Sequence, residues 1–369
     1  MRVGYLFAIS LSAFLIKRPE ALLALAFLQV GLWVLARLPL RELARAATRL
    51  LPFSLTVLLL CALFPPEGAS PATHERIVLG MSLGWHPDGL GYGARMILRI
   101  FAVVTASGWV QRTGNPGDFV AGLRGWFLPE SVAGTIAATL TLLDSEPARQ
   151  GGGGGGGSGR GDGGGRGARA QEAGQPTLRR ILKGEADFLP GLIDSAIARA
   201  RGKSAVLSSA ALSDDVAVLT GICLLMLGTK LSKILPGIPF APGYKTALLL
   251  PLYFVAADRT RMRFGATVAG TTMGVISFLF GDGRYGVFEI LKHAAPGLVV
   301  DAAAPAFDSL RGRTFPFVLI ATLAAAARLS SILMVVWFVD GNSALYAAAA
   351  LQGASQLAFG AASGVVAAR

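Results

Sequence analysis

Apolar residues in this chain form runs of helical length, separated by short charged or Pro/Gly-rich stretches. Runs over 3–16 and 21–35 predict two helices. We interpret the first as a retained helix rather than a signal peptide, because no small-residue cleavage site follows it. Two more runs, 51–64 and 92–110, flank a loop that carries both signs of charge. This pattern predicts a group of membrane helices at the N-terminal end.

The next apolar run, 130–143, contains fourteen residues and is short for a bilayer crossing at 1.5 Å per residue. If it crossed, the segment 145–203, with ten Arg/Lys and six Asp/Glu, would lie outside. Positively charged loops favour the cytoplasmic side. We therefore expect 130–143 to be a re-entrant or interfacial helix.

The C-terminal part shows a regular alternation of apolar segments and charged loops. The segments that we expect to be helices are 216–235, 244–256, 264–281, 286–303, 316–338 and 344–368. Arginines gather at 259–263 and 311–313, whereas the intervening loops have few positive charges. This asymmetry predicts one orientation for the whole group, with the arginine-rich loops inside.

Composition supports the same class, because 53% of residues are hydrophobic, 15% are charged and mean hydropathy is +0.56. We expect an all-α polytopic membrane protein. It would have about four transmembrane helices plus cytoplasmic coupling helices, followed by a six-helix membrane bundle. The net charge of +12 fits cytoplasmic loops better than a nucleic-acid partner. Arg37, Arg41, Arg45 and Arg49 recur every four residues and predict a basic helical stripe along the headgroups.

Glycine dominates residues 151–168, beginning with seven consecutive glycines. Ordering such a segment is entropically costly, so it predicts a flexible linker. An RGG-like nucleic-acid segment is the alternative. The tract is no phosphate loop, since the Lys-Ser/Thr pair that must follow the last glycine is missing.

A series of short motifs is typical of one transporter family. The series consists of Thr113, Phe119-Val120-Ala121-Gly122-Leu123, Leu128-Pro129, Leu189-Pro190 and Ala200-Arg201-Gly202. In this order it resembles the CbiQ-like transmembrane T component of energy-coupling factor (ECF) transporters. The family's second, upstream Ala-Arg-Gly is degenerate here, because Ala148-Arg149 leads directly into the glycine tract.

The resemblance implies that cytoplasmic ABC ATPase subunits are partners and that Arg199, Ala200, Arg201 and Gly202 couple to them. A guanidinium at a helix end forms a rigid hydrogen-bonding fork that suits this role. The chain itself would hold no cofactor and catalyse no reaction, since ATP would bind the partner. The alternative is that Arg199 and Arg201 are solvated charges.

The C-terminal part is similar to the substrate-binding S components of the same transporters. The expected domains are therefore a T-like coupling module over 1–205 and an S-like binding module over 210–369. Small residues four apart predict close helix contacts, either against the coupling module or within the bundle. These pairs are Ala217 with Gly221, Gly270 with Gly274, and Gly360 with Gly364.

Ionisable and amide side chains inside the apolar segments are the candidate substrate-binding residues, since such groups are costly in a membrane. They are Tyr285, Glu289, His293, Arg328, Gln352 and Gln356. Together they suit a small polar organic molecule, and the rival interpretation is a structural ion pair between Glu289 and Arg328. A metal is less favoured, because imidazole and thiolate groups are not clustered.

The sequence thus predicts a multi-pass subunit of the cell (inner) membrane with a cytoplasmic N-terminus. Its expected role is to couple ATP hydrolysis by partner subunits to uptake of a vitamin-like molecule, by toppling of the binding module. Two alternatives remain open. One is a secondary transporter driven by protons through Glu289, His293 and Arg328. The other is an intramembrane enzyme acting on lipid-linked substrates, with Asp214 and Asp215 among its polar groups.

Overall fold

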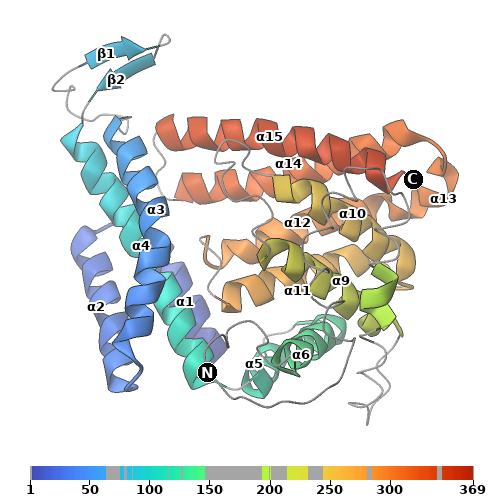
Figure 1. Cartoon of the computed structure of the whole chain (residues 1–369), viewed down its shortest axis with the longest axis horizontal. Coiled ribbons are helices and arrows are strands. Elements are labelled where there is room, and N and C mark those ends of the chain that lie inside the picture. Colours follow the sequence, from blue (N-terminus) through green and yellow to red (C-terminus); the bar gives the residue numbers. More distant parts are fainter. Residues whose placement is uncertain are drawn as a thin grey trace, which may run out of the picture.

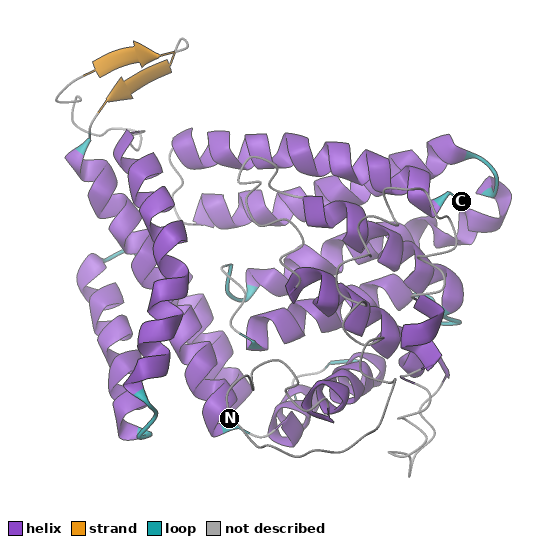
Figure 2. Ribbon diagram, viewed as in Figure 1, coloured by secondary structure: helices purple, strands orange, loops and turns teal. Residues whose placement is uncertain are grey.

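A computed structural model shows that the chain is built mainly from α-helices (Figures 1 and 2). The all-α membrane class predicted from the sequence is confirmed. The structure describes residues 2–63, 75–78, 81–84, 86–114, 116–125, 128–145, 193–198, 200, 214–231, 244–280, 285–338 and 343–368. The predicted linker over 151–168 lies outside these residues.

The N-terminal helices are α1 (Arg2–Leu15), α2 (Pro19–Leu35), α3 (Leu40–Leu63) and α4 (Pro87–Thr113). α3 bends by 45° between Thr48 and Leu50. Pro52 lies inside α3 and lacks the N–H that would bond to the carbonyl of Thr48, which explains a bend at this point. The expected four-arginine stripe is wrong in one respect, because Arg37 lies in the turn before α3 with a φ of 52°.

An antiparallel hairpin joins α3 to α4, and the sequence pattern did not predict it. Its strands are β1 (Glu75–Val78) and β2 (Met81–Gly84), with Glu75 opposite Gly84 and Val78 opposite Met81. Figure 2 shows the hairpin beyond the ends of α3 and α4, away from the remaining helices. These two strands are the non-helical elements among the described residues of the N-terminal part.

Two short helices, α5 (Pro116–Arg124) and α6 (Glu130–Ser145), connect the N-terminal helices to the rest of the fold. α6 packs against α9 (Asp214–Leu231) and α11 (Gly265–Leu279). Val132, Ile136 and Leu140 of α6 are buried in the main hydrophobic core. The segment 130–143 is thus a helix that packs against the C-terminal bundle, and its re-entrant or interfacial position stays a prediction.

The C-terminal bundle contains the helices that the apolar segments predicted. They are α9, α10 (Tyr244–Arg259), α11, α12 (Phe288–Ala303), α14 (Thr314–Phe338) and α15 (Ser343–Ala367), with η1 (Ala304–Ala306) and α13 (Phe307–Leu310) between α12 and α14. Asp301 caps α11 from the end of α12, since its carboxylate accepts bonds from the Ala266 and Thr267 amides at 3.0 and 2.7 Å.

Within the described residues, fewer helices are long and apolar enough to cross a membrane than the sequence predicted. α4 and α14 have this length and hydropathy, and α3 has them if its two bent halves count as one span. α1, α2, α6 and α11 are apolar but shorter. Several leucines on α2, α3 and α14 are exposed, as expected for surfaces in contact with lipid.

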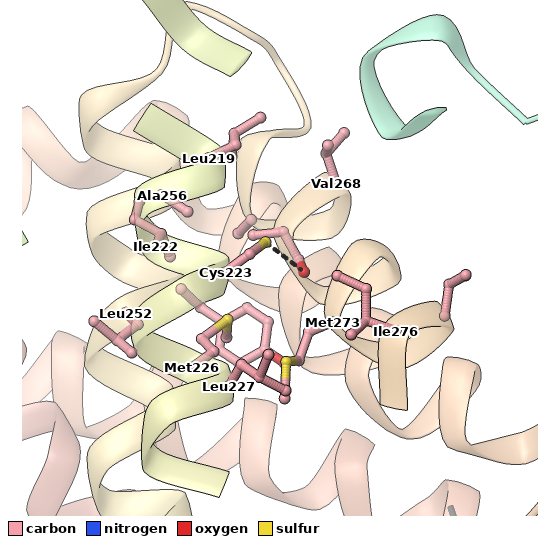
Figure 3. Close-up of a cluster of buried hydrophobic side chains, with 14 of the residues drawn as sticks. Leu219, Ile222, Cys223, Met226, Leu227, Leu252, Ala256, Val268, Met273 and Ile276 are labelled. Atoms are coloured by element: carbon pink, nitrogen blue, oxygen red, sulfur yellow. Dashed lines mark hydrogen bonds between the residues drawn. The ribbon is translucent and has the colours of Figure 1, made fainter. Parts of the chain in front are cut away.

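The main core joins both parts of the molecule. Figure 3 shows its centre, where Ile222 and Met226 of α9 lie beside Leu252 of α10 and Met273 of α11. The thiol of Cys223 lies 3.6 Å from the carbonyl oxygen of Ala269. Cys61 and Cys223 are both buried thiols.

The two parts of the chain lie side by side, with their helices running in different directions. In Figure 1, α2, α3 and α4 run roughly vertically, whereas α14 and α15 run horizontally. α11 and α12 follow a direction similar to that of α14 and α15. The end of α11 meets α4, because the hydroxyl of Ser107 donates to the Leu279 carbonyl at 2.6 Å. Gln111 donates to the same oxygen. These bonds satisfy a carbonyl that the end of a helix leaves open.

A second polar contact joins α1 to the start of α12. The amide of Val287 donates to the Ser10 hydroxyl at 2.8 Å, and the rings of Phe14 and Phe288 pack edge to face at 5.6 Å. Arg99 of α4 is 4% exposed and donates to the Ile16 carbonyl at 3.0 Å, close to the C-terminal end of α1. Helix C-termini favour such cations.

Candidate functional site

Polar side chains from several helices converge inside the C-terminal bundle. Glu289 and His293 of α12 are each 1% exposed, Gln356 of α15 is 2% exposed and Arg328 of α14 is 9% exposed. Tyr253 of α10, which the sequence analysis did not single out, is fully buried beside them. Buried polar groups of this kind are costly in a membrane protein unless they pair with one another or bind a ligand. We call these five residues the buried polar cluster.

Close packing of α11 on α12 positions one side of the buried polar cluster. A Cβ atom at Gly270 would lie 2.2 Å from the His293 carbonyl oxygen and 3.0 Å from a ring carbon of Tyr253. The hydroxyl of Tyr253 donates to that carbonyl at 3.0 Å and lies 3.4 Å from Nδ1 of His293. Because Gly270 has no Cβ, both the Tyr253 ring and the α12 backbone can approach α11 closely at this point.

Glu289 is paired on its own helix. Nζ of Lys292 lies 2.9 and 3.2 Å from the two carboxylate oxygens of Glu289, and Nε2 of His293 lies 3.6 Å from Oε1. Lys292 also sits 4.7 Å from the ring centroid of Tyr285. The sequence analysis missed Lys292, although its spacing of three residues from Glu289 is a helical pairing distance. Lys292, rather than Arg328, is the ion-pair partner of Glu289.

Arg328 and Gln356 lie at similar heights on two antiparallel helices. Gly353 of α15 faces Leu329 of α14, and Gly360 faces Ala325, so Gln356 falls between these contacts. Nε of Arg328 and Oε1 of Gln356 are buried and make no hydrogen bond within the described part of the chain. Arg328 and Glu289 both lie within electrostatic range of the Tyr253 hydroxyl. The structure thus brings Glu289, His293, Arg328 and Gln356 into one region.

The other two predicted binding residues are less central. Tyr285 lines a cavity of about 20 Å³ between the two parts of the chain, together with Phe14 of α1 and Arg99 of α4. This cavity has room for a single water molecule. Gln352 is half-buried, one helical turn before Gln356.

The groups proposed for an intramembrane enzyme do not assemble. The Asp215 carboxylate accepts a bond from the Arg261 amide at 3.1 Å, next to the loop before α11. Glu289 lies at the opposite end of α12 from the turn where Asp301 caps α11. Within the described residues, no group of three or more His, Cys, Asp or Glu side chains is placed to hold a metal ion.

The predicted coupling residues are described only in part. Arg199, Arg201 and Gly202 lie outside the described residues, and Ala200 is 1% exposed. Residues 193–198 are helical, and Ile193 and Ile197 are buried in the main core. A Cβ at Gly221 of α9 would lie 3.0 Å from the Cα of Ile197. We call residues 193–202 the coupling segment, and its helical stretch 193–198 lies directly on the C-terminal bundle.

The predicted small-residue pairs serve two kinds of contact. Gly270 and Gly274 face α12, and Gly360 and Gly364 face α14, so these pairs pack within the bundle. Gly221 instead faces the backbone of Ile197 in the coupling segment. Packing within the bundle is thus found for two of these pairs, whereas movement against a coupling module stays a prediction.

Comparison with known proteins shows that the N-terminal part is similar to a family of membrane transport components. The profile of the CbiQ family, described as cobalt transport protein, matches residues 2–143 and ends within α6. Members of this family are membrane components of ECF transporters that work with ATPase subunits, and they are not enzymes. No curated protein and no solved structure matches the chain. The match leaves the C-terminal bundle uncovered.

Proposed function

We propose that the chain is a membrane subunit of an ECF-type importer, in which its N-terminal part couples to ABC ATPases and its C-terminal bundle binds a small organic molecule. The observation that carries this proposal is the family match over residues 2–143. Within the described residues, the six longer helices that follow the coupling segment form a bundle that holds the buried polar cluster. Transport of a vitamin-like molecule from outside to inside is the function that this combination fits best.

The crossed arrangement of the helices supports a toppling mechanism. Transmembrane helices tilt on average by about 20° from the membrane normal. If α3 and α4 follow the normal, α14 and α15 lie far from it (Figure 1). We infer that the C-terminal bundle has its toppled orientation in this structure. Its helices would lie closer to the membrane normal when it captures substrate outside.

The coupling segment has a direct route to the C-terminal bundle. Ile197 packs on Gly221 of α9, and Asp194 lies 3.8 Å from Arg259 at the end of α10. A push by an ATPase on residues 199–202 would therefore reach α9 and α10 without passing through the N-terminal helices. This contact supports a role for the segment in moving the bundle.

Co-purification from native membranes tests the proposal. A tagged chain is expected to recover an ABC ATPase, and Arg201→Glu is expected to lose it. Arg313→Glu is the matched control, because Arg313 is also an arginine in a loop predicted to be cytoplasmic, and it is exposed. Failure of the well-folded chain to recover any ATPase would contradict the proposal. Uptake driven by membrane potential without ATP would instead indicate a proton-driven carrier.

A second candidate substrate is a divalent metal ion, which the description of the matching family favours. Uptake of labelled Co²⁺ by cells that express the chain and its ATPases would distinguish the two. Accumulation that depends on the chain and is lost with Arg201→Glu would assign cobalt transport. Accumulation equal to that of cells without the chain would leave the organic substrate as the remaining candidate.

A further inference from the structure

The buried polar cluster and its neighbour Lys292 contain an excess of positive charge. Lys292 and Arg328 each carry one positive charge, and Glu289 is the carboxylate beside them. His293 contributes a third positive charge only when it is protonated. Since Lys292 already pairs with Glu289 at 2.9 Å, the charge of Arg328 is left over.

Among the residues that the structure describes, the guanidinium of Arg328 has no partner that would explain its burial. Its Nε is buried and has no hydrogen-bond partner in the described part of the chain, and the residue is only 9% exposed. A buried charge without a counter-ion is strongly unfavourable, more so at membrane depth. Arg328 also cannot lose its proton, since its pKa is far above neutral pH. The described part of the chain thus supplies no group that compensates this charge, which leaves a place for one on a bound molecule.

The geometry of a guanidinium defines that group. Its N–H donors form a planar fork that fits the two oxygens of a carboxylate or phosphate. Gln356, on the neighbouring helix, has a buried Oε1 without a partner and an amide group that can donate. We propose that the molecule bound by the C-terminal bundle carries a carboxylate or phosphate, and that Arg328 is its counter-ion with Gln356 beside it. Transport of this anion rests on the proposed function, whereas its binding does not.

Stability without ligand gives the first test, on the full chain in phosphatidylcholine nanodiscs. Arg328→Met is expected to leave the melting temperature unchanged or raise it, because it removes an uncompensated buried charge. Lys292→Met is the matched control and is expected to lower the melting temperature by several degrees, because it breaks the pair with Glu289. A similar drop for Arg328→Met would show that Arg328 is structural and would overturn the proposal.

Ligand binding gives the second test, with benzoate, its neutral isostere benzamide, and inorganic phosphate as probes. Benzoate or phosphate is expected to raise the melting temperature of the wild-type chain saturably, and benzamide is not. Arg328→Met should lose the response, Arg328→Lys should retain part of it, and Arg313→Gln should retain all of it. An equal response to benzamide, no response to either anion, or a response that survives Arg328→Met would overturn the proposal.

A lipid headgroup is another source of phosphate, and nanodiscs containing phosphatidylglycerol distinguish it. Stabilisation by this lipid that requires Arg328 and is not displaced by benzoate would assign the anion to the bilayer and overturn a transported anion. ATPase co-purification with Arg328→Met separates this test from the proposed function, because recovery is expected to be normal. If no variant recovers an ATPase, the proposed function fails while the anion-binding result still stands.

Discussion

At the residue scale, single glycines determine how closely α11 approaches α12 and hence where the buried polar cluster forms. Gly270 leaves space for both the His293 carbonyl and the Tyr253 ring, and a Cβ there would lie 2.2 Å from a backbone oxygen. A backbone atom cannot move aside as a flexible side chain can. The position of Tyr253 relative to His293 therefore depends on the absence of one methyl group.

The same substitution at two glycines should give effects of opposite sign. Gly270→Ala is expected to destabilise the protein by about 1–3 kcal/mol, as overpacking does. Gly228→Ala in α9 is expected to be neutral or stabilising by up to about 1 kcal/mol, since a Cβ there has nothing within 4 Å and alanine favours helix. Thermal unfolding of both variants in the same nanodiscs checks this. Equal stability of the two variants would contradict the packing role of Gly270.

At the element scale, local patterns predicted helices well and contacts between helices poorly. The segment predicted over 264–281 corresponds to α11, and that over 286–303 to α12, because polar loops bound each apolar run. The hairpin of β1 and β2 was missed, since each strand has only four residues and no clear alternation.

The candidate site could likewise be predicted within one helix but not between helices. The spacing of Glu289 and His293 placed both on one face of α12, and the structure buries both. The pairing of Glu289 with Lys292 instead of Arg328 depends on the positions of α12 and α14 in space, which helical spacing does not contain. Tyr253 was missed because a tyrosine in an apolar run has no distinguishing pattern until His293 is placed beside it.

Contact between the coupling segment and α9 makes a prediction at this scale. Gly221→Leu is expected to displace residues 193–198, because its Cβ would lie 3.0 Å from backbone atoms of Ile197. Hydrogen exchange of these amides should then speed up at least tenfold, corresponding to about 1.4 kcal/mol of lost protection. Gly228→Leu on the same helix is the control, as a Cβ there has no neighbour within 4 Å. Unchanged exchange in Gly221→Leu would show that the segment does not depend on this contact.

At the scale of the whole molecule, the two parts of the chain are held together by more than the segment that links them. Ser107 and Gln111 of α4 bind the last carbonyls of α11, and Ser10 of α1 binds the amide of Val287. Between these polar contacts, Phe7 packs on Phe278 at 5.1 Å and Phe14 on Phe288. These contacts join residues up to 277 positions apart in the sequence.

This junction predicts that the covalent link is dispensable for assembly. If the chain is divided between Gly154 and Gly155 and both pieces are co-expressed, a tag on the first piece should recover the second from detergent-solubilised membranes. Ser107→Leu should reduce recovery several-fold, because it removes the bonds to α11 and places a bulky group against its last turn. Ser330→Leu is the matched control, since Ser330 is exposed on α14 and bonds only within its own helix, to Ala327. Recovery of equal amounts with Ser107→Leu would mean that α6 and the main core alone hold the parts together. Loss of recovery without any substitution would mean that the link itself is required, and the junction would then be a contact of the intact chain only.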